Sequence, residues 1–256
     1  MNGNRVLNWC KEHKGLVKAF IMMWVPLLCC MMTCALEDRS IGDVYLPASE
    51  WNDELFYFKQ VEGILSNGYP QGYFGFNESH AEVLSFAAWS PVLVFPWIIW
   101  GLLFGWNLMA PIYCNILLMM LAVFMFVLLV NPKGKQLLYL ALMLPVFTPM
   151  TRFMLSGMPE VICFAAVTIL LGVAVSYSRV ESGVKLAVML VLTSLMTLMR
   201  PYLLLFMLLP AYYWIKKNKK AGIIGTVLVM GATGSVYILI NKYLSAPYLT
   251  PLFDVT

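Results

Sequence analysis

The sequence predicts an all-α, polytopic membrane protein, and three observations lead to that prediction. Hydrophobic residues make up 61% of the 256 residues, charged residues make up 12%, and the mean hydropathy is +0.78. A soluble domain carries about twice that fraction of charge. Several apolar stretches reach or approach the roughly 20 residues that a helix needs to cross the hydrocarbon core of a bilayer. Transmembrane barrels instead show alternating segments of ~10 residues, a pattern that this sequence lacks.

We expect one membrane module over residues 1–256, with about seven transmembrane helices and two interfacial helices. After the first span, residues 37–106 form an exterior loop that contains both interfacial helices. Six further spans occupy residues 107–243. Residues 244–256 form an exterior tail, and we expect the chain to be part of a longer protein that continues beyond it. The seven predicted spans are residues 16–36, 108–130, 136–151, 158–177, 184–199, 201–215 and 221–243.

The distribution of charge predicts how the chain threads the membrane. Residues 91–105, PVLVFPWIIWGLLFG, contain two prolines and two tryptophans, which favours an interfacial helix over a span. With that stretch in the interface, 12 of the 17 basic residues and only 2 of the 13 acidic residues share one side. The positive-inside rule makes that side cytoplasmic. The same rule divides residues 184–215 into two helices that are hinged at Arg200 and Pro201.

The predicted location is therefore a cell (plasma) membrane, with a cytoplasmic N-terminus and a long exterior first loop. An endoplasmic-reticulum membrane would give the same topology, with the lumen in place of the exterior. The other 11 acidic residues all face the exterior, nine of them in the long loop. This acidic exterior face excludes a nucleic-acid binder and leaves membrane lipids as the surroundings of the chain.

The exterior loop carries an acidic, aromatic segment, EWNDELFYFKQ, at residues 50–60. Ser49 can cap a helix that starts near Glu50, and acidic residues suit the first turn of a helix. Residues 50–67 are therefore predicted to form an amphipathic helix that lies on the membrane and stops at Gly68. The following NGYPQGYFGFNESH is predicted to be a turn-rich connector. A second exterior loop, TRFMLSGMPE, and the turn at the Arg-Pro hinge complete the exterior features.

The order of these exterior motifs resembles the GT-C superfamily of membrane glycosyltransferases. The likeness is to the aminoarabinose-transferase and protein O-mannosyltransferase type, in its bacterial polysaccharide-synthesis branch. DELFYFKQVEGILSNGYP resembles the first-loop signature of these enzymes, and FMLSGMPEVICFAAV resembles their second acidic motif, which contributes Glu160. MRPYLLLFMLLP resembles an Arg-Pro turn of bacterial members. The first signature matches at Asp53, Glu54, Tyr57, Gly68 and Pro70.

Two positions depart from the pattern of that superfamily. Phe56 stands where many members carry arginine, and Glu160 stands where many carry aspartate. These departures affect the contacts expected with the sugar donor.

The resemblance implies a glycosyltransferase that moves a sugar from a polyprenyl-phosphate (lipid-linked) donor to a glycan, lipid or protein acceptor. Transfer would take place at the outer face of the membrane, with inversion at the anomeric carbon. A carboxylate can serve as the base for an acceptor hydroxyl, and Asp53 is the candidate. Glu54 and Glu160 would orient the acceptor or a metal.

The leaving phosphate gathers negative charge, which an arginine or a divalent metal can neutralise. Arg152 and Arg200 are the candidates for that role, and Tyr57 and His80 complete the candidate substrate-binding residues. The cofactor is left open. If Mg or Mn takes part, Asp53 and Glu160 would be its ligands.

Each candidate also has a plain structural interpretation. Asp53 and Glu54 could be solvated acids of a first helical turn, and Glu160 could be a helix-start acid. Both candidate arginines could be interface anchors that extend toward water, and His80 could be an ordinary loop residue.

Two other classes of function compete with the transferase. A transporter or flippase of lipid-linked sugars would place charges in mid-membrane and often shows inverted repeats. No repeat is apparent in this sequence, and its charged groups are predicted to gather at membrane surfaces, which favours surface chemistry. A truncated, non-catalytic membrane module is the other alternative.

Overall fold

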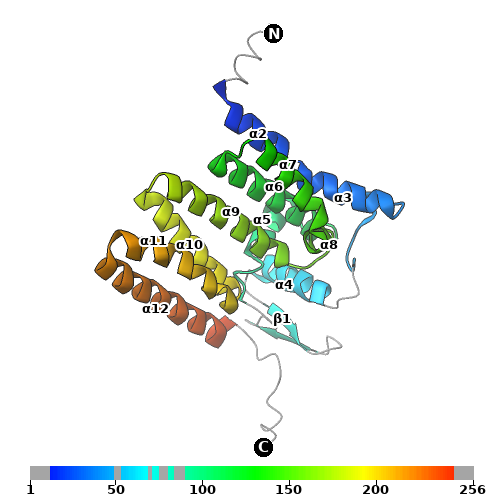
Figure 1. The fold of residues 1–256 in the computed structure, drawn as a ribbon. Helices are drawn as coiled ribbons and strands as arrows, with labels where there is room; N and C mark the ends of the chain where they lie inside the picture. Colours follow the sequence, from blue (N-terminus) through cyan, green and yellow to red (C-terminus); the bar gives the residue numbers. More distant parts are fainter. Residues whose placement is uncertain (1–11, 49–52, 69–70, 75–79, 84–89, 245–256) are drawn as a thin grey trace, which may run out of the picture.

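The computed structural model describes residues 12–48, 53–68, 71–74, 80–83 and 90–244, and within them the chain is a bundle of helices with one small hairpin (Figure 1). The α-helices are α2 (Lys14–Met22), α3 (Val25–Leu36), α4 (Asp53–Asn67), α5 (Phe95–Phe104), α6 (Ala110–Val130), α7 (Gly134–Val146), α8 (Thr148–Met154), α9 (Glu160–Arg179), α10 (Gly183–Met199), α11 (Leu208–Lys217) and α12 (Lys219–Leu244). Two 3-10 helices, η1 (Ile41–Asp43) and η2 (Pro201–Met207), and two strands, β1 (Gln71–Phe74) and β2 (His80–Val83), complete the described elements.

Four segments are long and apolar enough to cross a membrane: Lys14–Leu36, Ala110–Val130, Glu160–Arg179 and Lys219–Ile240. Helices α7 and α8 pass the same test only together, and they are bent by 64° where they meet. Pro145 inside α7 and Pro149 at the start of α8 account for this bend, because proline removes a helical hydrogen bond and clashes with the preceding turn. The helical class is thus confirmed, and four to five segments are candidate membrane spans.

The remaining two predicted spans correspond to shorter helices. Helix α10 has 17 residues, and the next stretch is divided into the 7-residue η2 and the 10-residue α11. The predicted hinge is confirmed: α10 ends at Met199 and η2 begins at Pro201, whose missing N–H is not needed in a first turn. Helix α10 then packs back along η2 and α11.

The centre of the bundle is the pairing of α6 with α9 (Figure 1). Gly172 lets the two backbones approach closely, because a Cβ atom at this position would lie 3.2 Å from the Cα atom of Phe126. Small residues at such contacts are typical of membrane helix packing. Helix α2 lies along α6 on one side, and α10 lies along α9 on the other.

The predicted helix of the exterior loop is confirmed over Asp53–Asn67, and Gly68 follows it with a φ of +76°, as a helix stop requires. The predicted cap, Ser49, lies outside the described residues. The buried face of α4 is not purely apolar, since it includes Glu54 and Gln60. One face of α4 therefore packs against the rest of the protein, and its other residues are partly or fully exposed.

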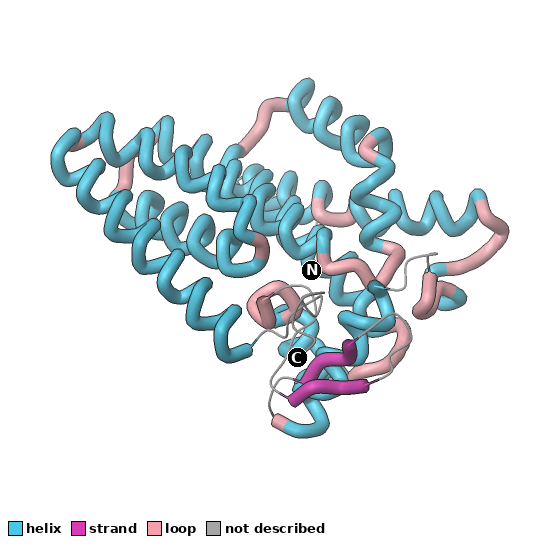
Figure 2. Tube along the Cα trace, turned by 90° about the horizontal axis from the view of Figure 1, so that it is seen from below, coloured by secondary structure: helices cyan, strands magenta, loops and turns pink. Residues whose placement is uncertain are grey.

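The connector after α4 was predicted to be turn-rich, and the structure adds a hairpin that was not predicted. Residues of β1 and β2 pair antiparallel, with Gln71 opposite Val83 and Phe74 opposite His80 (Figure 2). Tyr73 and Phe74 favour extended backbone, and pairing satisfies the polar groups of two extended segments. The Gly and Pro residues of the connector dominated the sequence pattern and concealed this hairpin.

Helix α5 covers most of the stretch predicted to lie in the interface. Trp97 is fully buried, while Leu102, Leu103 and Phe104 at the other end of the helix are about two-thirds exposed. An exposed cluster of this kind fits an environment of lipid rather than water. Gly101 faces Leu65 of α4 so closely that a Cβ atom would lie 2.4 Å from a leucine methyl, so α4 and α5 are in contact.

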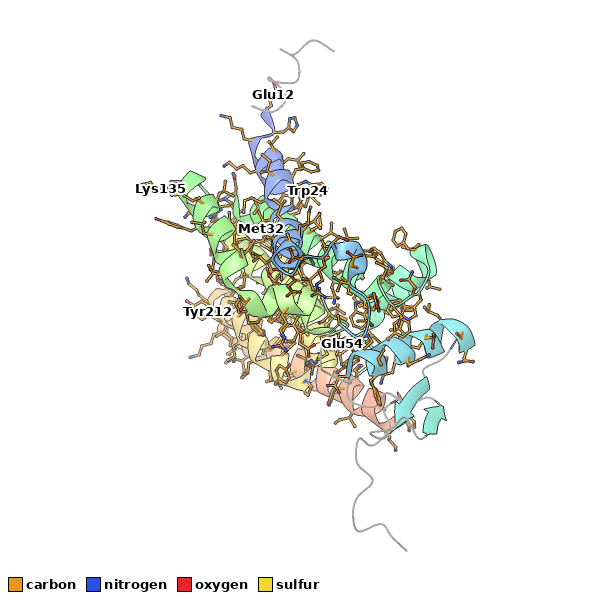
Figure 3. All side chains as sticks on the ribbon, turned by 90° about the vertical axis from the view of Figure 1, so that its right-hand side faces the viewer. Glu12, Trp24, Met32, Glu54, Lys135 and Tyr212 are labelled. Carbon is orange, nitrogen blue, oxygen red and sulfur yellow. The ribbon has the colours of Figure 1, made fainter. Side chains whose placement is uncertain are left out.

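Basic side chains gather at one end of the bundle and bind the ends of its helices. The ammonium of Lys18 donates to the carbonyl of Pro132, just after α6. The guanidinium of Arg179 donates to the carbonyl of Val130, and Lys185 donates to the carbonyls of Ser176 and Val180. Figure 3 shows Lys135, in this basic region, far from Glu54 of α4. We call these two regions the basic end and the acidic end.

Candidate functional site

Four predicted site residues come together at the acidic end, where α4, the start of α9 and the turn before η2 meet. The charged groups that act on the Tyr57 hydroxyl are Arg200, Glu160 and Asp53. Asp53 and Arg200 are likewise the charged neighbours of Glu160. We call these four residues the carboxylate–arginine cluster. Its members come from three segments that are separated by about 40 to 100 residues in the sequence, a grouping that only the tertiary fold produces.

The core of the cluster is an ion pair between Arg200 Nη2 and Glu160 Oε1. The side chain of Arg200 is 7% exposed and that of Glu160 is 23% exposed. Desolvating two charges is costly, so each partner depends on the other to remain ionised in this place. The second carboxylate oxygen of Glu160, Oε2, is buried and has no hydrogen-bond partner among the described residues.

Tyr57 lies against this pair with 4% of its surface exposed. Burial raises the pKa of the Tyr57 hydroxyl, and the positive charge of the Arg200 guanidinium opposes that rise. The phenol is therefore neutral at physiological pH and retains its O–H as a donor. Tyr57 links the helix that carries Asp53 to the ion pair.

Asp53 and Glu54 are adjacent in sequence but occupy different environments, because consecutive helical residues do not face the same side. Asp53 is the first residue of α4 and is exposed, so its carboxylate can be reached from solvent. Glu54 is fully buried and accepts a hydrogen bond from the backbone N–H of Ala48 at 2.7 Å. The geometry thus leaves Asp53 available for chemistry and uses Glu54 as an anchor.

The anchor is enclosed by the loop before α9. A Cβ atom at Gly157 would lie 3.2 Å from Glu54 Cβ and 2.8 Å from two methyl carbons of Leu46. The loop can pass over Glu54 at this distance only because residue 157 has no side chain.

Sequence reasoning missed Asn115, which holds the same loop in place. Its side chain is fully buried in α6 and accepts a hydrogen bond from Trp97 Nε1 at 2.9 Å. Its amide group donates to the carbonyls of Ser156 at 3.1 Å and Met158 at 3.2 Å. These bonds fix the residues immediately before Glu160. A single asparagine in an apolar span of 21 residues was the signal that could have revealed it.

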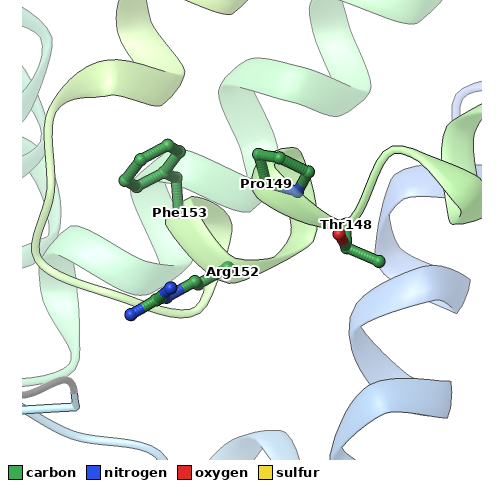
Figure 4. Close-up of a pocket in the computed structure, with 4 residues that line it drawn as sticks. All are labelled: Thr148, Pro149, Arg152 and Phe153. Atoms are coloured by element: carbon green, nitrogen blue, oxygen red, sulfur yellow. The ribbon is translucent and has the colours of Figure 1, made fainter.

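The other two candidates lie on other elements, α8 and β2. Arg152 was expected in an exterior loop, but residues 148–154 form α8, because proline at the second position is well suited to start a helix. Arg152 lines a partly open hollow of about 240 Å³ with Thr148, Pro149 and Phe153 (Figure 4). His80 begins β2.

Among the described residues, no three His, Cys, Asp or Glu side chains gather closely enough to form a metal site by themselves. Asp53 and Glu160 nevertheless supply two carboxylates to one region. Mg²⁺ is commonly held by one or two carboxylates together with water and substrate phosphates. These two residues are therefore the ones that would hold such an ion.

Comparisons with known proteins give no further identification. No protein-family model matches the chain, and no curated protein or solved structure is significantly similar to it.

Proposed function

We propose that this chain is a GT-C-type glycosyltransferase module that uses a polyprenyl-phosphate sugar at the outer face of the membrane. The observation that carries the proposal is the carboxylate–arginine cluster. An exposed carboxylate, Asp53, lies near a buried Glu160–Arg200 ion pair, at the end of the bundle opposite the basic residues. The two acidic motifs and the Arg-Pro turn of the resemblance thus belong to one group of side chains.

In the proposed reaction, the acceptor hydroxyl gives its proton to the Asp53 carboxylate while its oxygen attacks the anomeric carbon. The bond between that carbon and the phosphate oxygen breaks, and polyprenyl phosphate leaves with the electron pair. Attack from the side opposite the leaving group inverts the anomeric centre. Arg200 stabilises the charge on the phosphate, and Glu160 positions the guanidinium.

The proposal places the basic end in the cytoplasm and the acidic end outside, with seven crossings of the membrane. Helix α4 and the exposed apolar tip of α5 would then lie at the outer interface, where a lipid tail stays in the bilayer while its sugar meets water. Arg152, exposed on α8, remains a second candidate for the donor phosphate, and His80 one for the substrate.

The first test is acceptor-dependent release of polyprenyl phosphate from a panel of lipid-linked sugars. Membranes with the chain in its full native reading frame are compared with membranes carrying Asp53→Asn. Loss of a general base reduces rates by about 10²–10⁴-fold, so release should fall by at least ~100-fold at equal expression. Glu62→Gln is the matched control, because Glu62 is another carboxylate of α4 and pairs with Lys59.

Equal release from the wild type and Asp53→Asn would remove Asp53 as the base. No release from the wild type, combined with passage of the labelled lipid-linked sugar across the membrane, would replace the transferase with a flippase.

A further inference from the structure

A row of polar side chains continues from the cluster along α4. Asp53, Tyr57 and Gln60 are spaced by four and then three residues, which places them on one face of the helix. Gln60 is 1% exposed, although glutamine is usually found at protein surfaces. The proposed reaction uses Asp53 and gives Gln60 no role.

This face of α4 is turned toward the segments that carry the ion pair. Tyr57 and Val61, on either side of Gln60 in the sequence, belong to one apolar cluster with Ile162 and Cys163 of α9. Leu203 of η2 belongs to the same cluster. The face of α4 that carries Gln60 therefore packs against the elements that position Glu160 and Arg200.

Gln60 Nε2, which is a donor, and Glu160 Oε2, which is an acceptor, are buried and have no hydrogen-bond partner among the described residues. More than about 90% of buried polar groups in proteins are hydrogen-bonded, because an unpaired one carries the full penalty of desolvation. An unpaired donor on α4 and an unpaired acceptor at the start of α9 would suit a group that can both accept and donate.

We propose that Gln60 and Glu160 Oε2 form a subsite that recognises sugar hydroxyl groups on the lipid-linked donor; this inference rests on the proposed function. A hydroxyl oxygen accepts from the Gln60 amide, and a hydroxyl hydrogen is donated to Glu160. A phosphate has only acceptors at neutral pH and would be repelled by the carboxylate. An ammonium has only donors and could not pair with Gln60 Nε2. The phosphate therefore belongs to Arg200 and the hydroxylated ring to this subsite.

The experiment measures the midpoint temperature of unfolding of the full chain, purified in detergent. It is measured with no ligand, with polyprenyl phosphate, and with polyprenyl-phosphate glycosides that include hexose, N-acetylhexosamine and amino-pentose head groups. The head-group increment is the midpoint with a glycoside minus the midpoint with polyprenyl phosphate. Wild type is compared with Gln60→Met, which has similar volume and no polar atoms, and with Gln60→Leu as a second variant. Thr193→Val is the matched control, because Thr193 is a fully buried polar residue whose hydroxyl already donates to the Met189 carbonyl.

We expect at least one glycoside to give the wild type a head-group increment, and both Gln60 variants to lose it while keeping the response to polyprenyl phosphate. We also expect both variants to be more stable than the wild type without ligand, since they remove an unpaired buried donor. Thr193→Val should keep the increment. A purely structural Gln60 would give the opposite result, with a lower ligand-free midpoint and an unchanged increment.

An increment retained by the Gln60 variants, or one absent from the wild type with every glycoside, would overturn the subsite. Polyprenyl-phosphate release is measured on the same proteins to separate the two proposals. If polyprenyl phosphate is released and the Gln60 variants retain the head-group increment, the transferase proposal holds and the subsite proposal fails. If the head-group increment is lost in the Gln60 variants but no polyprenyl phosphate is released by the wild type, the subsite proposal holds and the transferase proposal fails.

Discussion

The two ends of the bundle carry charge in different ways. At the basic end, Lys18, Arg179 and Lys185 extend along the surface and donate to backbone carbonyls near the ends of helices. At the acidic end, Glu54 is fully buried, and Arg200 and Glu160 pair inside the protein. Charges at the first end remain close to water, whereas those at the second end have been desolvated.

This difference separates charges that stay hydrated near helix ends from charges that are paired inside the protein. A cation near a helix C-terminus interacts favourably with the helix dipole and keeps most of its hydration. A buried charge is strongly destabilising unless its partners are in place, so its presence indicates a specific role for the local geometry. The acidic end is therefore where substitutions should have the larger effects.

The largest effect is expected from Arg200→Met, which leaves the Glu160 carboxylate without its partner. We expect a loss of roughly 3 kcal/mol in the free energy of unfolding, at the lower end for buried pairs because Glu160 is 23% exposed. Denaturant unfolding in detergent measures it. The double variant Glu160→Gln/Arg200→Met should recover most of the loss.

Arg39→Met is the matched control for that experiment, because Arg39 pairs with Glu37 at the surface, where both side chains are well exposed. Its cost should stay below about 1 kcal/mol. Similar losses of unfolding free energy for Arg200→Met and Arg39→Met would show that the buried ion pair contributes no more than a surface pair. The proposed difference between the two environments would then be wrong.

A smaller effect is expected from Glu54→Gln, which weakens the acceptor for the Ala48 N–H. Hydrogen bonds to charged groups contribute about 1.5–3 kcal/mol, so we expect a loss of about 2 kcal/mol in unfolding free energy. Asp53→Asn, one residue away and exposed, should change stability by less than about 0.5 kcal/mol. A larger loss of unfolding free energy for Asp53→Asn than for Glu54→Gln would contradict this assignment. It would mean that Asp53 is the anchor and Glu54 is the available carboxylate.

The smallest effect on stability is expected from two substitutions that each introduce a surface cysteine. These cysteines show which side of the membrane the basic end and the acidic end face. Lys217→Cys at the basic end and Asn67→Cys at the end of α4 should each cost less than about 0.5 kcal/mol, since both positions are exposed. An impermeant thiol reagent applied to intact cells should label Asn67→Cys and leave Lys217→Cys unlabelled until the membrane is opened. The five described native cysteines are all buried, which keeps their background low. Labelling of Lys217→Cys alone would invert the proposed topology.

Much of the helical framework could be predicted from the sequence. Apolar length predicted the segments around α6, α9 and α12, and the Arg-Pro hinge followed from charge and from proline's preference for a first turn. Gly68 was expected as a helix stop and has the positive φ that this role requires. These features depend on local chemistry, which a short stretch of sequence contains.

The candidate site could be predicted only as a list of residues. Sequence order gave no means to tell that Asp53 is exposed while Glu54 is buried, since that depends on which face of α4 meets the loop at Gly157. Asn115 was missed because its partners, Trp97 and the carbonyls before Glu160, lie 18 to 43 residues away. The hairpin of β1 and β2 was missed because strand pairing is a property of two segments together.

By itself, the sequence determined that this chain is a helical membrane protein with basic and acidic residues segregated along it, because hydropathy and charge act through composition and need no knowledge of contacts. Only the tertiary structure decided which charges are desolvated together. It brought Arg200 to Glu160, set Tyr57 beside them and enclosed Gln60. Burial and pairing change the free energy of an ionised or polar group far more than its neighbours in sequence do, and both arise only when distant segments pack.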